Sequence, residues 1–219
     1  MSQSFPHANA PVLATGAPLD EADLVVILNH GRGSTADNIL GLAAEITPEG
    51  AQGRIAFIAP QAEGNAWYPY RYIEPIARNE PWLGGALAKL DAIVDHVREA
   101  RPEIPVVVGG FSQGACLALE YLARGSRELS GAIGLAGGLI GPSVTDRLTI
   151  GDLDGTQVFI GVGTTDVHIP VDNATESAAA LKAARATVDF RTYPNMDHTI
   201  NQDEIEAARS LIAKTLPAE

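Results

Sequence analysis

A five-residue segment, Gly110-Phe111-Ser112-Gln113-Gly114, constrains the fold of this chain more than any other feature. It follows the apolar run 105–109, which has the composition of a buried strand, and it opens a segment that we expect to be helical. A serine in such a strand-to-helix turn is strained, and the two glycines leave room for the neighbouring strand and helix. Because chance would place Gly-x-Ser-x-Gly in roughly one chain in ten of this length, its meaning depends on the surrounding sequence.

Apolar segments of strand length alternate with segments of helical periodicity along the chain. We expect strands at 24–29, 54–59, 105–109, 132–136, 157–162 and 187–193, and helices at 37–46, 83–100, 113–124, 172–185 and 202–216. Strands that are apolar throughout are typical of a parallel sheet with helices on both faces. The sequence therefore predicts a single α/β domain over 1–219. Residues 1–22 are expected to be partly loose or to add an edge strand near Val12.

Charge and cysteine content exclude several classes of function. The formal net charge of −12 argues against nucleic acid or an anionic membrane as the main partner, because both require basic patches. The only cysteine, Cys116, is expected to be a buried small side chain, and we find neither a signal peptide nor a membrane-spanning run. We therefore expect a cytoplasmic protein. No metal-ligand spacing and no nucleotide-binding glycine pattern is present, so we expect no metal and no cofactor.

Four polar loops follow predicted strands, at 30–34, Ser112, Asp166 and His198. Because the carboxyl ends of parallel strands meet at one edge of a sheet, these loops should converge there. A serine hydroxyl becomes a nucleophile when an imidazole accepts its proton and a carboxylate orients that imidazole. The order Ser112, Asp166, His198 is the order of the α/β-hydrolase fold. Asp197 is the weaker candidate for the acid, because adjacent side chains seldom pair in the required way.

The same edge should supply hydrogen-bond donors for the oxyanion and a substrate pocket. We predict that the backbone N–H groups of Gln113, the residue after the nucleophile, and of Arg32 form the oxyanion hole. Residues 60–82 lack clear periodicity, and a loop of that length is usually functional. Aromatic and basic side chains near this edge are candidates for substrate binding: His30, Trp67, Tyr70 and Arg71.

Four segments together resemble the phospholipase/carboxylesterase family of serine hydrolases, which includes acyl-protein thioesterases, lysophospholipases and small bacterial esterases. The segments are His30-Gly31-Arg32-Gly33, Gly110-Phe111-Ser112-Gln113-Gly114, 163–170 and 193–198. The resemblance implies an α/β-hydrolase fold with little or no lid, Ser112, Asp166 and His198 as the catalytic triad, and often a homodimer. Residues 67–71, Trp-Tyr-Pro-Tyr-Arg, resemble the bacterial esterase branch, which favours small esters.

We therefore expect a serine carboxylesterase that hydrolyses small carboxylic esters through an acyl-enzyme on Ser112. A thioesterase or lysophospholipase acting on longer acyl chains is the alternative within the enzymes. A non-catalytic protein that uses the same fold to bind a small ligand is the alternative from another class. The expected partner is a small ester.

Overall fold

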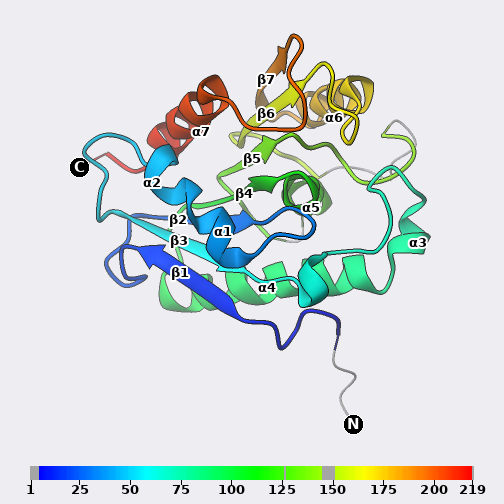
Figure 1. Ribbon diagram of the computed structural model, residues 1–219. Helices are drawn as coiled ribbons and strands as arrows, with labels where there is room; N and C mark the ends of the chain where they lie inside the picture. The colour runs from blue at the N-terminus through cyan, green and yellow to red at the C-terminus, as the bar shows by residue number, and fades with distance from the viewer. Residues whose placement is uncertain (1–4, 126, 145–150, 219) are drawn as a thin grey trace.

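The computed structural model describes residues 5–125, 127–144 and 151–218 of the 219-residue chain, and its centre is one seven-stranded sheet. Strand order across the sheet is β1-β3-β2-β4-β5-β6-β7 (Figure 1). β1 pairs antiparallel with β3, and every other neighbouring pair is parallel. The strands are β1 (Val12–Gly16), β2 (Leu24–Asn29), β3 (Ile55–Pro60), β4 (Val106–Phe111), β5 (Gly131–Leu135), β6 (Gln157–Gly163) and β7 (Thr187–Tyr193).

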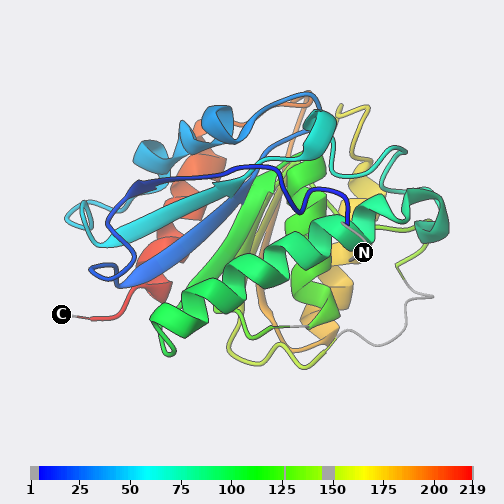
Figure 2. The same ribbon diagram turned by 90° about the horizontal axis from the view of Figure 1, so that it is seen from below.

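Helices cover both faces of the sheet, as the apolar strands predict. One face packs against α4, α5 and α6, and the other against α1, α2 and α7 (Figure 2). The helices are α1 (Ala36–Leu40), α2 (Leu42–Ile46), α3 (Ile76–Asn79), α4 (Trp82–Ala100), α5 (Gln113–Arg124), α6 (Val171–Ala183) and α7 (Gln202–Thr215), with a 3-10 turn η1 (Glu63–Asn65). The predicted α/β-hydrolase fold is therefore confirmed. No helix in the described ranges is long and apolar enough to cross a membrane.

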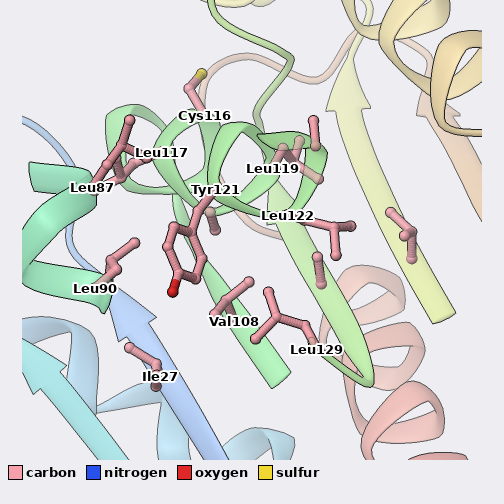
Figure 3. Packing of buried hydrophobic residues seen from close by; sticks show 14 of the residues in the cluster. Ile27, Leu87, Leu90, Val108, Cys116, Leu117, Leu119, Tyr121, Leu122 and Leu129 are labelled. Atoms are coloured by element: carbon pink, nitrogen blue, oxygen red, sulfur yellow. The ribbon is translucent and has the colours of Figure 1, made fainter. Parts of the chain in front are cut away.

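The two apolar cores lie on opposite sides of the central strands. In β2, Val25 and Ile27 belong to one core, while Val26 and Leu28 belong to the other, because side chains alternate along a strand. On the first face, Tyr121 of α5 points toward the sheet beside Leu90 and Val108 (Figure 3). Burying a side chain of leucine size contributes about 1.5–3 kcal/mol, so these contacts fix α5 on β4 and with it the turn that carries Ser112.

Local departures from the expected elements have identifiable causes. The helix expected at 37–46 is two short helices, because Gly41 closes the first with a hydrogen bond from its N–H to the Asn38 carbonyl (3.1 Å). The strand expected at 54–59 extends one residue further, because Pro60 is the last residue of β3 and pairs with Val12 of the edge strand β1. The segment 60–82 is expected to be irregular, but it contains η1 and α3 and the first residue of α4.

Candidate active site

Ser112 occupies the turn between β4 and α5 in a strained backbone conformation. Its φ is 56° and its ψ is −119°, a region that costs a non-glycine residue about 1–3 kcal/mol. Hydrogen bonds on both sides hold the turn: the Ser112 N–H donates to the Leu135 carbonyl (2.9 Å), and the Ser112 carbonyl accepts from the Cys116 N–H (2.9 Å). The sheet and the helix therefore fix the serine hydroxyl at the carboxyl edge of the sheet.

The two glycines of the pentapeptide are required by close backbone packing. A Cβ on Gly110 would lie 2.3 Å from the Asn29 carbonyl oxygen, and a Cβ on Gly114 would lie 2.0 Å from the same atom. Both distances are shorter than any real Cβ contact, so a larger residue would push the end of β2 away from the turn. This is the steric reason expected from the sequence.

Ser112, His198 and Asp166 form a continuous chain of hydrogen bonds. His198 Nε2 accepts from Ser112 Oγ at 2.7 Å, and His198 Nδ1 donates to Asp166 Oδ2 at 2.7 Å. The carboxylate can only accept, so it places the ring proton on Nδ1 and leaves Nε2 free to take the serine proton. The structure thus brings together the three side chains expected to form the triad, from the ends of β4 and β6 and from the loop after β7.

The carboxylate of Asp166 is held in place from both sides. Its side chain is fully buried, and Oδ1 accepts hydrogen bonds from the N–H groups of His168 (2.7 Å) and Ile169 (2.9 Å). These bonds leave Oδ2 directed at His198. Asp197 is engaged elsewhere, because its Oδ1 accepts from Thr165 Oγ1 at 2.8 Å, which ties the loop after β6 to the loop after β7.

One predicted oxyanion donor follows Ser112 directly in the chain, and the loop that carries the other contacts the Ser112 turn. Gln113 is the first residue of α5, so its N–H is one of the four donors at a helix start that have no intrahelical acceptor. The loop that contains Arg32 packs on the nucleophile, since a Cβ on Gly31 would lie 3.6 Å from the Cβ of Ser112. The assignment of these two N–H groups to the oxyanion stays a prediction.

An open cleft of about 630 Å³ exposes Ser112 and His198. Tyr70 and Arg71 line this cleft, as expected for substrate-binding residues, and their role stays a prediction. Cys116 lies beneath the cleft and is completely buried, and burial raises the pKa of its thiol to about 12. The thiol therefore stays protonated, which leaves Ser112 as the nucleophile in this cleft.

Two residues proposed to bind substrate have structural roles. His30 and Trp67 are both 0% exposed and neither lines the cleft, so the structure does not bring them together with Tyr70 and Arg71, and a substrate contact by either stays a prediction. Burial lowers the pKa of His30, whose Nε2 accepts from the Ala62 N–H (3.1 Å) and whose Nδ1 donates to the Gly31 carbonyl (2.8 Å). Trp67 Nε1 donates to the His30 carbonyl at 2.8 Å. Both side chains fasten the segment after β3 to the end of β2.

The sequence did not indicate that two side chains of the predicted oxyanion loops would hold the wall of the cleft. The Arg32 guanidinium donates to the carbonyls of Tyr68 (2.9 Å), Pro69 (3.0 Å) and Tyr70 (2.8 Å). The Gln113 side chain accepts from the Trp67 N–H (2.9 Å) and donates to the Tyr68 carbonyl (2.8 Å). No local pattern reveals these contacts, because the bonded residues lie 36 to 46 positions apart.

His168 is a second histidine of the cleft, and it is not the one that contacts Ser112. Its ring lies against the His198 ring with centroids 4.7 Å apart, and it lines the cleft. Its place in the cleft follows from the turn at 166–169, which folds back around the Asp166 carboxylate.

A strained serine between a parallel strand and a helix, next to a histidine and a buried aspartate, defines a serine hydrolase of the α/β-hydrolase fold. Residues 11–216 match the family model described as Phospholipase/Carboxylesterase, and the chain belongs to that family. Its members include esterases and thioesterases.

Individual relatives agree with this assignment. A crystal structure of a phospholipase/carboxylesterase from Dyadobacter fermentans is 37% identical, superimposes with a TM-score of 0.84, and covers 94% of this chain and 97% of that chain. Acyl-protein thioesterase 1 homolog 1 of Dictyostelium discoideum is 26% identical over 208 residues, which are 88% of this chain and 90% of the relative. Lysophospholipase-like protein 1 of Mus musculus is 28% identical over 132 residues, which span 55% of that protein.

Proposed function

We propose that this enzyme is a carboxylesterase that hydrolyses small carboxylic esters through an acyl-enzyme on Ser112. The observation that carries the proposal is the chain of two 2.7 Å hydrogen bonds from Ser112 through His198 to Asp166, which opens into the cleft. A binding protein has no need of a strained serine, an imidazole with a free nitrogen and a buried carboxylate in one line.

The proposed reaction begins when Ser112 Oγ attacks the ester carbonyl and His198 Nε2 takes the hydroxyl proton. Asp166 stabilises the imidazolium that forms. The N–H groups of Arg32 and Gln113 donate to the carbonyl oxygen as it becomes negative, a contribution of about 3 kcal/mol for each such donor in a comparable site.

Collapse of the tetrahedral intermediate breaks the bond to the leaving oxygen. His198 Nε2 gives its proton to that oxygen, so an alcohol leaves and the acyl group stays on Ser112. Water then loses a proton to His198 and attacks the acyl-enzyme. Ser112 leaves with that proton, and the carboxylic acid is released. The reaction as proposed needs no cofactor.

Replacing the nucleophile tests the proposal. We expect Ser112→Ala to reduce turnover of p-nitrophenyl acetate and butyrate by about 10⁴ to 10⁶-fold, while the circular dichroism spectrum is unchanged. Ser130→Ala is a matched control, because Ser130 precedes β5 at the opposite end of the sheet from the cleft. Intact-mass analysis after treatment with a fluorophosphonate should show one adduct, absent from Ser112→Ala. Near-normal hydrolysis by Ser112→Ala, or labelling of that variant, would overturn the assignment.

A thioesterase acting on longer acyl chains is the second candidate, favoured by the similarity to acyl-protein thioesterases. Arg71, Glu74 and Arg78 line part of the cleft and favour a short polar substrate there, while Tyr68, Pro69 and Ile169 also line it. Values of kcat/KM for acyl groups of two to sixteen carbons, each as oxyester and thioester, decide between the two. The esterase should be most active on short oxyesters, whereas a maximum at long thioesters would establish the alternative.

A further inference from the structure

The cleft has a charge opposite to that of the protein. The whole chain carries 15 Lys and Arg against 27 Asp and Glu, which gives a formal net charge of −12. The residues that line the cleft nevertheless include three arginines, and Glu74 is the only carboxylate among them, with the Asp166 carboxylate buried behind His198. A cationic cleft in an acidic protein concentrates an anionic ligand at that cleft and repels it elsewhere.

Two of the three arginines already have strong partners. The Arg32 guanidinium donates to the carbonyls of residues 68, 69 and 70. Arg78 donates to Glu74 at 2.7 Å, and its guanidinium lies 4.2 Å from the centre of the Tyr70 ring. These contacts position the two side chains as parts of the cleft wall, and Glu74 neutralises the charge of Arg78.

Arg71 is the third arginine, and its guanidinium is weakly engaged. Its contact within the described residues is from Nη2 to the His168 carbonyl at 3.5 Å, the outer limit of a hydrogen bond. It forms no ion pair with any carboxylate in the part of the chain that the structure describes. The centroid of the His168 ring lies 4.7 Å from that of the His198 ring, and His198 contacts Ser112. His168 is therefore the one residue that lies between Arg71 and the catalytic histidine.

We propose that Arg71 binds a carboxylate of the substrate, and hence that the preferred substrates are esters that carry a carboxylate in the acyl or the alcohol part. The inference rests on the proposed esterase function and specifies its substrate class. A planar guanidinium with free N–H groups matches a carboxylate in a bidentate pair. One weakly engaged cation balances one negative charge, which favours a carboxylate over a phosphate monoester dianion.

Two pairs of substrates that differ in one charge test the proposal. Mono-p-nitrophenyl glutarate and its methyl ester differ in the acyl part, and 4-acetoxybenzoate and its methyl ester differ in the alcohol part. We expect the ratio of kcat/KM for the anionic over the neutral ester to exceed one in at least one pair. In Arg71→Gln that ratio should fall about tenfold, mainly through KM, and Arg71→Lys should restore part of it.

Arg185→Gln is the matched control, because it also removes one positive charge. Arg185 is exposed and pairs with Asp152, before β7 and away from the cleft. Its ratio should equal that of the wild type. A ratio at or below one in both pairs, or the same fall in Arg185→Gln as in Arg71→Gln, would overturn the proposal.

A binding measurement separates failure of this inference from failure of the esterase assignment. Isothermal titration of glutarate into Ser112→Ala requires no catalysis. We expect Arg71→Gln in that background to raise the dissociation constant at least about fivefold. Equal affinity with and without Arg71 refutes the inference even for an active esterase. If the wild type hydrolyses neither the four esters nor p-nitrophenyl acetate, the proposed function fails, and this titration still decides the role of Arg71.

Discussion

Glu204, a buried carboxyl group behind the loop that carries His198, should make the stability of the protein depend on pH. It is the third residue of α7 and completes a capping box, in which its Oε2 accepts from the Asn201 N–H at 2.9 Å. It is 0% exposed, and its Oε1 has no hydrogen-bond partner in the described residues. Burial raises the pKa of Glu204 to about 7, and the nearby carboxylates of Asp203 and Asp166 act in the same direction.

The direction of the effect follows from which state releases the proton first. The unfolded chain releases it near the ordinary pKa of 4.5, whereas the folded state holds it until about pH 7. The contribution of protonated Glu204 to the stability of the fold is therefore fully present below pH 4.5 and is lost as the pH rises through about 7. The difference between the two pKa values corresponds to about 3 kcal/mol.

Glu204→Gln removes this titration and keeps an oxygen to accept from Asn201. We expect the free energy of unfolding of the variant to increase relative to that of the wild type by about 3 kcal/mol between pH 4.5 and pH 8, because only the wild type loses stability over this range. Urea unfolding followed by circular dichroism at four pH values measures this change. Glu206→Gln is the matched control, because Glu206 lies on the exposed side of the same helix and should show no such trend. If the difference in the free energy of unfolding between Glu204→Gln and the wild type stays constant within about 0.5 kcal/mol from pH 4.5 to pH 8, the reasoning is refuted.

Two further substitutions test how the site is held. Gly114→Ala should destabilise the protein by about 3 kcal/mol in urea unfolding, because the added Cβ would lie 2.0 Å from the Asn29 carbonyl oxygen. Gly151→Ala is the control, because its Cβ would meet only Gly125 Cα at 3.8 Å. Equal stabilities of the two variants would contradict the steric argument. Arg32→Gln removes three hydrogen bonds to the carbonyls of residues 68–70 and should lower kcat/KM for esters at least about tenfold. Amide hydrogen exchange in residues 68–70 should become faster, and unchanged exchange would show that these three hydrogen bonds do not hold the segment in place.

The parts of the structure that were predictable from sequence depend on local patterns. The apolar run Leu24–Asn29 indicates a strand because its length and composition fit one, and the pentapeptide at 110–114 indicates the turn because glycine is needed where backbones touch. The order of Ser112, Asp166 and His198 predicts that they meet, because all three follow strands of one parallel sheet. These inferences use neighbouring residues and topology alone.

The parts that were missed depend on packing between distant segments. His30 and Trp67 have the side chains expected of a binding site, yet each is buried against the other, with ring centroids 5.0 Å apart. Composition does not distinguish a buried aromatic side chain from one in a cleft, because both occur in irregular loops. Glu204 is a similar case, since only the space left by Gly161 on β6 allows its carboxyl group to be buried there.

The two residues proposed to supply the oxyanion donors also hold the wall of the cleft through their side chains. Arg32 and Gln113 both bond the Tyr68 carbonyl, so the positions of their backbone N–H groups and of the aromatic segment are set together. A shift of the cleft wall at residues 68–70 would therefore move the two N–H donors relative to Ser112 Oγ. A substrate that contacts this wall differently should consequently change the rate of the reaction as well as the affinity. Arg71 lies in the same wall but has no bond to the turn at Ser112. Substitutions at Arg32 or Gln113 should consequently change turnover and specificity together, whereas substitution at Arg71 should act on specificity through KM.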